Sequence, residues 1–372
     1  MAHPPSDDQK NALARLPADL PVAQVVVANP SLVAAPVWEV PFDEEELTDI
    51  ADCIKKSKAL NTQTTYAAAW ARYVNWTKHL GLAAIDPSAP IDYAAQVAIK
   101  FLRYRACAGK SANTLQIDLA AIGYYRKKAR LPPLNKVPEV SEFLTGLAKD
   151  QAAPHKASAI MMNLCHRLAA HIGTRTLANT RDRALILMAG CAGLRRSEIC
   201  EMRQEHFTLS AKGAAVHIFR SKTDQKQRGR DFFLPRHMWG EEHCPVEAVE
   251  LWLAASGLLS EKDKQTPLFR GLGASGQATK WALGGEDMRR ILKKHLATLL
   301  PHLPAELRPK PGQKISPHSF RSGFITECYL RGASFEEIAY FTGHKDRKTM
   351  DGYFDSTQMH AAHPLSKKRK VT

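Results

Sequence analysis

The sequence predicts a mainly α-helical protein of two domains, with a small β-sheet in the second domain. Most apolar residues recur at intervals of three and four, which is the spacing of one helix face. Two short β-prone runs lie close together in the second half of the chain, separated by a polar stretch. The chain has 372 residues and is 44% apolar, which is enough for more than one hydrophobic core.

The first domain is expected to be helical and to span residues 43–150. Residues 1–42 carry seven prolines and no sustained period, so we expect them to form a flexible tail. A helix is predicted to begin near Asp43, where acidic residues fill the first turn and lysines the last. In the next helix Tyr66, Trp70 and Tyr73 share one face, and Gly81 can end it. Further helical patterns run through residues 97–102, 115–122 and 140–147, the second of them after a cap at residues 111–114.

The charge balance predicts a polyanionic partner. Lysine and arginine total 52 against 37 acidic residues, so the formal net charge is +15, and nucleic acid is the first candidate. The longest apolar stretch, residues 185–194, is too short to span a bilayer, and the N-terminus does not resemble a secretory signal. We therefore expect a soluble protein that stays inside the cell. The seven cysteines are scattered without a CxxC pair, which favours reduced, buried thiols.

The exposed face of the helical domain is expected to be basic. Such a face can bind phosphates, although a solvated lysine and arginine surface is the commoner meaning of a single basic run. The candidate DNA-binding residues are Arg103, Arg105, Lys110, Arg126, Lys127, Lys128 and Arg130.

The second domain is expected to span residues 159–355, after a polar linker at residues 151–158. Its first strong pattern is a buried helix that we expect to break at Gly190 and Gly193, before a helical period resumes. Residues 214–222 and 230–235 predict a β-hairpin with a charged tip, near which Lys222 lies. Two helices are predicted next, with a glycine-rich loop between them at residues 271–285.

The last third of the chain concentrates residues that suit phosphate chemistry. His318 and Arg321 are three apart, so on a helix they share a face. Tyr353 lies nine residues after His344, and Arg195 lies just after the Gly193 bend. Cutting DNA without a metal requires cations for the phosphate oxygens, proton carriers and an oxygen nucleophile. The sequence supplies all three.

The motifs that carry these residues resemble the signature boxes of the tyrosine recombinase, or phage integrase, family. The matching motifs are "AGLRRSEI", "HSFR", "GH" and the tyrosine nine residues later. The resemblance is to Cre-like and Xer-like enzymes, and it extends over roughly residues 45–360 because "TTYAAAWARYVNW" and "SANTLQIDLAAIGYYRKKARLPP" are similar to the helical half of these enzymes. It implies a C-shaped clamp made of a helical core-binding domain and an α+β catalytic domain.

The resemblance also implies roles for individual residues. Arg195 and Arg321 would bind the non-bridging oxygens of the scissile phosphate, for which guanidinium has the fitting bidentate geometry. Tyr353 would be the nucleophile, leaving a 3′-phosphotyrosine and a free 5′ hydroxyl. Because the ester retains the bond energy, the reaction would need no cofactor.

Four further residues receive roles from the same resemblance. Lys222 would protonate the leaving 5′ oxygen, with Lys226 as the alternative, since hairpin register is hard to fix from sequence. His318 would handle the tyrosine proton, and His344 would hydrogen-bond the phosphate. Glu198 matches the family's acidic residue that orients its neighbours, and a surface partner for Arg195 is the alternative reading.

Assembly and partners follow from the resemblance as well. Residues 356–372 have the length of the family's terminal segment, which docks into a neighbouring subunit. We therefore expect a monomer when free and four protomers on two double-stranded DNA sites with inverted repeats, acting through a Holliday junction. The terminal "SKKRKV" resembles a nuclear-import signal, with a solvated tail or a fused tag as alternatives. No metal is expected, because His344, His360 and His363 lack zinc-site spacing.

Two other functions remain open on the sequence alone. A type IB topoisomerase shares this chemistry but nicks one strand and acts as a monomer, and the helical first half and the terminal tail argue against it. A DNA-binding regulator that has lost the reaction would not need to keep Tyr353 and both arginines.

Overall fold

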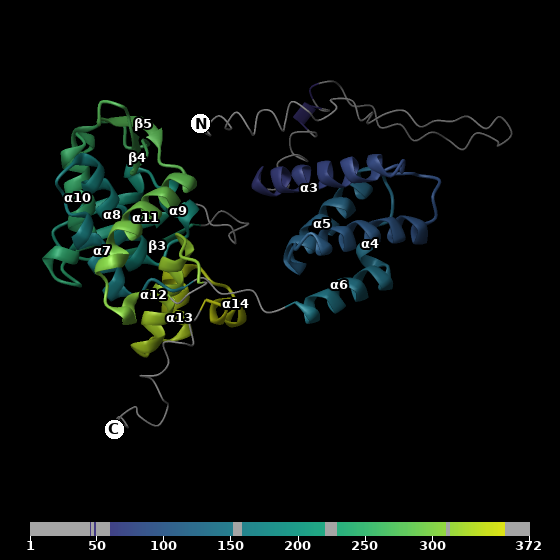
Figure 1. Ribbon diagram of the computed structural model, residues 1–372. Helices are drawn as coiled ribbons and strands as arrows, with labels where there is room; N and C mark the ends of the chain where they lie inside the picture. Colours follow the sequence, from purple (N-terminus) through teal and green to yellow (C-terminus); the bar gives the residue numbers. More distant parts are fainter. Residues whose placement is uncertain are drawn as a thin grey trace. The chain divides into compact units, whose positions relative to one another are not determined.

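The computed structural model describes residues 45, 48–49, 60–151, 158–219, 229–309 and 313–353 (Figure 1). The chain divides into two compact units, Met1–Ala153 and Pro154–Thr372. In the part of the chain that the structure describes, no helix is both long and apolar enough to cross a membrane.

The first unit contains the helices α3 (Leu60–His79), α4 (Ile91–Cys107), α5 (Ala112–Lys128) and α6 (Pro138–Asp150). Their apolar faces meet in one core that includes Phe101, Leu102, Leu115 and Ile122. The predicted helical periods are confirmed, and Ser111 caps α5 by accepting a hydrogen bond from the Thr114 backbone. The helix predicted near Asp43 falls mostly outside the described residues, although residues 45, 48 and 49 are helical.

Two of the basic residues expected on the exposed face of this unit are not exposed. Arg126 is buried, and its Nε donates to the Pro132 carbonyl at 3.0 Å. Arg105 is partly buried and pairs at 3.0 Å with Asp118, whose side chain is fully buried. The expectation is wrong for these two because Arg105 pairs with a buried carboxylate and Arg126 turns inward to bind a loop carbonyl. The exposed members of the set are Arg103, Lys110, Lys127, Lys128 and Arg130.

The second unit is built around α8 (Leu177–Ala192), whose residues 184–192 are all buried. The helices α7 (Met162–Ile172), α10 (Pro245–Ala255) and α12 (His318–Leu330) pack against it, and α11 (Gly285–Leu299) packs on α7. The expected break at Gly190 is wrong, and the helix ends only at Gly193. Gly190 stays helical because its missing side chain makes room for Cys165, whose Sγ would lie 2.4 Å from a Cβ there.

The predicted hairpin is confirmed as part of an antiparallel sheet in the order β1-β2-β3, made by β1 (Phe207–Ser210), β2 (Gly213–Ile218) and β3 (Arg230–Pro235). Ile218 pairs with Arg230 at the loop end of the hairpin, where residues 219–229 connect the two strands. The glycine-rich segment expected to be a loop contains a second hairpin, β4 (Arg270–Leu272) and β5 (Ala278–Ala282). The strands were not predicted because each is too short to show an alternating period, and five residues of turn separate them.

The chain closes with α13 (Phe335–Thr342) and α14 (Arg347–Asp351), drawn in yellow in Figure 1 together with α12. A small core of Ile325, Ile338 and Met350 holds these three helices together. This core fixes the segment on which Tyr353 lies, because partly buried Tyr353 packs against it.

Candidate active site

Arg195 is positioned by the end of α8. Gly193 adopts a left-handed conformation with φ 58°, which turns the chain so that Arg195 becomes the N-cap of the short helix α9 (Arg196–Cys200). The carboxylate of Glu198 accepts one hydrogen bond from the Arg195 backbone N–H at 2.9 Å and another from Arg195 Nη1 at 2.7 Å. With its side chain only 1% exposed, Glu198 fixes both the backbone and the guanidinium of Arg195.

Arg321 lies on α12 and is fully buried. Its Nη1 donates to the Gly193 carbonyl at 2.8 Å, and its Nη2 donates to the Thr342 carbonyl at 2.6 Å. These carbonyls lie at the C-terminal ends of α8 and α13, where the helix dipole favours a cation. Burial first, and then the charge of Arg195, lower the pKa of Arg321 to about 10. Among the described residues, its buried Nε has no hydrogen-bond partner, although buried polar groups in native proteins usually bond to protein, water or ligand.

His344 follows the left-handed cap Gly343 of α13 and is buried. Its Nδ1 lies 2.8 Å from Thr342 Oγ1, and its Nε2 lies 3.2 Å from Arg321 Nη2. Because the Thr342 hydroxyl donates to the Ile338 carbonyl at 2.7 Å, it is placed to accept from His344, which favours the Nδ1 tautomer of neutral His344, although Arg321 Nη2 also lies 3.4 Å from Nδ1. Burial first, and then Arg321 and Arg195, lower the pKa of His344 to about 4, so the ring is neutral at pH 7.

Tyr353 completes the group just after α14. Its ring centroid lies 4.8 Å from that of His318 and 5.0 Å from that of His344, and Arg321 Cζ lies 5.5 Å from its centre. His318 begins α12, and its surface is exposed. Partial desolvation first, and then Arg321 and Arg195, nevertheless lower the pKa of His318, so it is also neutral at pH 7.

Arg230 is a member of this group that the sequence reasoning did not identify. Its Nη2 and Nη1 donate to the two oxygens of Glu198 at 2.9 and 3.3 Å, and its Nε donates to the Phe341 carbonyl at 3.1 Å. Burial raises the pKa of Glu198, but the bonds and charges of Arg230 and Arg195 outweigh burial and lower that pKa. No motif in the sequence marks Arg230, which begins β3 at the loop end of the hairpin.

The structure therefore brings six of the seven predicted site residues to one place. They come from segments up to 158 residues apart and are Arg195, Glu198, His318, Arg321, His344 and Tyr353. Lys222 lies outside the described residues, as does Lys226. The two strands that flank this segment end at the Ile218–Arg230 pair, and the side chain of Arg230 binds Glu198.

The site's chemistry suits a phosphate. Arg195 and Arg230 bind the carboxylate of Glu198, and Arg321 lies in the same group of residues. Three guanidinium groups against one carboxylate give these four side chains two net positive charges. Two neutral imidazoles lie beside the phenol ring of Tyr353. Such a set can bind an anion, accept a proton and supply an oxygen nucleophile.

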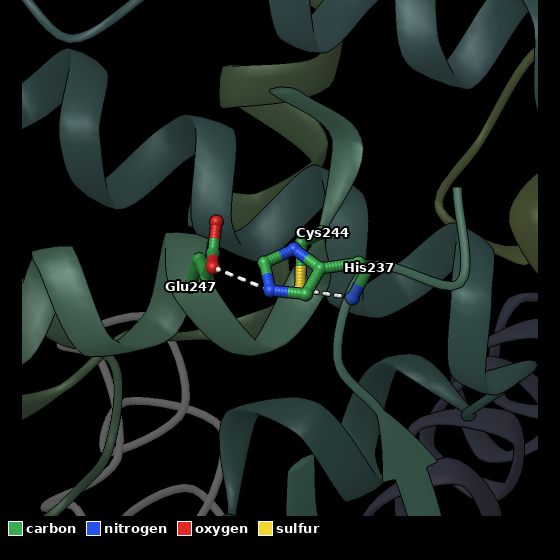
Figure 2. A group of neighbouring side chains, drawn as sticks. All are labelled: His237, Cys244 and Glu247. Atoms are coloured by element: carbon green, nitrogen blue, oxygen red, sulfur yellow. Dashed lines mark hydrogen bonds and ion pairs between the residues drawn. The ribbon is translucent and has the colours of Figure 1, made fainter. Parts of the chain in front are cut away.

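One group of possible metal ligands lies apart from these residues. Among the described residues, His237, Cys244 and Glu247 place their donor atoms within 4.8 Å of one another (Figure 2). His237 Nε2 lies 3.4 Å from Glu247 Oε1, and the His237 backbone N–H donates to Cys244 Sγ at 3.4 Å. Arg236 Nη1 lies 3.8 Å from the same oxygen of Glu247 and would repel a cation there, so we assign no ion.

Comparisons with known proteins identify the family. Residues 161–360 match the model of the phage integrase family. The chain is 25% identical over 308 residues to an integrase/recombinase xerD homolog of Selenomonas ruminantium, covering 81% of this chain and 83% of that protein.

Solved structures share the fold. XerH site-specific recombinase bound to palindromic difH substrate matches with a TM-score of 0.53 and 16% identity, covering 86% of this chain and 84% of that one. The Tn1549 transposon integrase with circular intermediate DNA matches with a TM-score of 0.53 and 17% identity, covering 83% and 94%. The family match spans more than half of the residues and includes every box that carries the converging side chains, so this chain belongs to the phage integrase family of tyrosine recombinases.

Proposed function

We propose that this chain is a site-specific DNA recombinase that cleaves and rejoins strands through a 3′-phosphotyrosine at Tyr353. The observation that carries the proposal is the convergence of the Tyr353 phenol, two neutral imidazoles and the buried Arg321 on one place. Family membership supports a DNA cleaving and rejoining activity, and the roles of single residues follow the resemblance, supported for the described residues by their contacts.

Cleavage begins with binding of the scissile phosphate. Arg195 and Arg321 donate to its two non-bridging oxygens, and both are held in advance, by Glu198 and by two helix-end carbonyls respectively. Arg321 Nε has no hydrogen-bond partner among the described residues, and a bound phosphate would bring an acceptor close to it. Preorganised donors of this kind need no reorganisation at the moment of reaction.

Proton transfers then balance the reaction. The phenol O–H bond of Tyr353 breaks as neutral His318 accepts the proton, and the phenol oxygen bonds to phosphorus. The bond from phosphorus to the 5′ oxygen breaks, and that oxygen takes a proton from Lys222. In rejoining, the 5′ hydroxyl of a partner strand attacks the phosphotyrosine, and the same protons move back. The bond energy stays in the ester, so no cofactor takes part.

His344 hydrogen-bonds the phosphate in its protonated form, whereas the ring is neutral in the free protein. In the free protein its lone pair on Nε2 faces Arg321, so neutral His344 cannot donate there. Burial first, and then the charges of Arg321 and Arg195, lower the pKa of His344 to about 4. A bound phosphate offsets the contribution of these charges and so favours the protonated ring, which can hydrogen-bond the phosphate.

DNA is bound by both units in this proposal. The chain carries a net charge of +15, and the helical unit exposes a basic set consisting of Arg103, Lys110, Lys127, Lys128 and Arg130. The XerH and Tn1549 proteins of similar fold are both described in complex with DNA. We propose double-stranded DNA with inverted-repeat sites as the substrate, and a tetramer that resolves a Holliday junction.

The tetramer requires a receiving site for residues 356–372 of a neighbouring copy. An apolar cavity of about 320 Å³ lies between β3 and the α12 and α13 helices, and we propose it as that site. Trp239, Phe324, Ile338 and Phe341 are among its lining residues. Because α13 ends at the carbonyls that hold Arg321 and Arg230, docking there would couple neighbouring active sites.

A covalent-trapping experiment tests the function. Wild-type protein is incubated with a library of nicked duplexes with randomised arms, and DNA that resists denaturing removal is recovered and sequenced. Wild type should form a covalent adduct, and Tyr353→Phe should form none while binding the recovered duplex with nearly unchanged affinity. Relaxation without exchange between paired sites would indicate a topoisomerase, binding without any adduct would indicate a regulator, and either result would reject the proposal.

A further inference from the structure

The carboxylate of Glu198 is completely occupied by two arginines. Its Oε1 accepts from Arg195 Nη1 at 2.7 Å and Arg230 Nη1 at 3.3 Å. Its Oε2 accepts from the Arg195 backbone N–H and from Arg230 Nη2, both at 2.9 Å. A carboxylate offers about four lone-pair directions, so these four donors fill it. Arg230 supplies half of the donors to a side chain that is only 1% exposed.

Arg230 also holds the other side of the site. Its Nε donates to the carbonyl of Phe341 in the last turn of α13. A Cβ placed on Gly343 would lie 2.9 Å from Arg230 Nη1, so the guanidinium packs directly on the turn that leads to His344. One side chain from β3 therefore joins α9, which follows Arg195, to the end of α13, which precedes His344.

The second arginine also changes the charge of the Arg195 and Glu198 pair. Alone, Glu198 would neutralise Arg195 and reduce its attraction for a phosphate. With Arg230 present, the three side chains carry one net positive charge. Arg195 and Arg230 are both 14% exposed in their side chains, so solvent screens this charge only partly.

We propose that Arg230 is a positioning residue for DNA cleavage: by sharing Glu198 with Arg195 and holding the last turn of α13, it keeps Arg195 and His344 directed at one phosphate. This inference rests on the proposed recombinase function. Arg230 need not touch the phosphate itself. Lysine cannot replace it, because one ammonium cannot bond two carboxylate oxygens and a carbonyl in the planar geometry of guanidinium.

Arg236, at the end of β3, provides a matched control. Its Nε donates to the Ser210 carbonyl at 3.1 Å, and its Nη2 pairs with Glu250 at 2.7 Å, the same kinds of contact that Arg230 makes. Its partners lie outside the candidate active site. Arg236→Lys therefore removes the same guanidinium geometry without touching Glu198.

The test measures single-turnover formation of the covalent adduct on the nicked duplex recovered with wild type. Arg230→Lys should slow adduct formation by about 10- to 100-fold, as loss of an outer-shell partner does at other sites, and DNA affinity should change by less than about threefold. Arg236→Lys should react at the wild-type rate. If wild type forms no adduct, the proposed function fails. If wild type and Arg230→Lys react equally fast, only the positioning role fails.

Two further readouts separate positioning from a general structural effect. Arg230→Gln removes the cation that lowers the pKa of Glu198, so its cleavage rate should begin to fall at a higher pH on the acidic side than that of wild type. Adding Arg230→Gln to Glu198→Gln should cause little further loss, because both variants break the same contact. Losses that multiply, or an unchanged pH profile, would overturn the proposal. Thermal melting confirms that each variant is folded, and Arg230→Lys decides the matter if Arg230→Gln is not.

Discussion

Thr342→Val tests whether one hydroxyl sets the proton position of His344. Thr342 is fully buried, and valine has nearly its shape, so the change replaces a hydroxyl by a methyl with little repacking. The variant loses the contact between Thr342 Oγ1 and His344 Nδ1 at 2.8 Å. The ring then keeps a buried N–H without an acceptor, or moves its proton to Nε2, where it faces the N–H groups of Arg321 at 3.2 Å.

Both outcomes lower the stability of the folded protein, and the size of this loss can be estimated from the contacts that are broken. An unsatisfied buried donor costs about 1–3 kcal/mol, so we expect Thr342→Val to lower the free energy of unfolding at pH 7 by that amount. If the same cost is felt when the phosphate is attacked, cleavage should slow by about 5- to 150-fold, since about 1.4 kcal/mol corresponds to a factor of ten. Thr342→Ser keeps the hydroxyl and should retain the wild-type cleavage rate to within a few-fold.

Urea denaturation, single-turnover cleavage and nitrogen NMR of labelled histidine measure the three consequences. Wild type and Thr342→Ser should show His344 with its proton on Nδ1, and Thr342→Val should not. Wild-type NMR spectra with the proton on Nε2 would refute the assignment. A Thr342→Val variant with wild-type stability and rate would show that the hydroxyl does not govern His344.

Three other predictions concern stability and assembly. The pKa of His344 falls from about 6.5 to about 4 on folding, so below pH 6.5 the unfolded chain binds a proton that the folded one does not. The free energy of unfolding should therefore drop by about 2 kcal/mol between pH 6.5 and 5, and urea titrations should show a smaller drop for His344→Asn. Gly323→Ala should lower the melting temperature markedly or prevent folding, because its Cβ would lie 1.8 Å from the Ile160 carbonyl oxygen. Gly146→Ala, on the open face of a helix, should instead raise the free energy of unfolding by about 0.5–1 kcal/mol, and equal melting temperatures of the two variants would contradict this packing. Removing residues 354–372 should leave DNA binding by one protomer nearly intact but abolish tetramers on paired sites in sedimentation, and tetramers that persist would show that another surface assembles them.

Much of the fold could be predicted because most elements carry a long, regular period. The aromatic face of α3 at Tyr66, Trp70 and Tyr73 and the alternating strands β2 and β3 are examples. The errors arose where packing overrides local preference. Gly190 stays helical because Cys165 occupies the space beside it, and the β4 and β5 strands are too short to show a period. Arg126 ends buried against a backbone carbonyl that no spacing in the sequence reveals.

The candidate site was likewise predictable only in part from the sequence. Residues within one motif, such as His318 and Arg321, could be placed together because three positions on a helix share a face. The partners of those residues could not, since they are backbone carbonyls at the ends of α8 and α13 or a side chain on a distant strand. Arg230 was missed for this reason: its function follows from tertiary contacts with Glu198 and Phe341, and nothing local distinguishes it from other arginines.

The different partners of the three arginines have a consequence for the charge of the site. Arg195 and Arg230 share one carboxylate, whereas the hydrogen bonds of Arg321 run to carbonyls, which hold a guanidinium without cancelling its charge. Three guanidinium groups and one carboxylate leave two positive charges. A phosphodiester carries one negative charge, and attack by a phenol oxygen that has given up its proton brings a second to the phosphorus. These four side chains therefore leave excess positive charge when the substrate is bound, and this charge stabilises the negative charge that develops during attack more than that of the bound substrate. Such differential binding accelerates a reaction instead of only retaining its substrate.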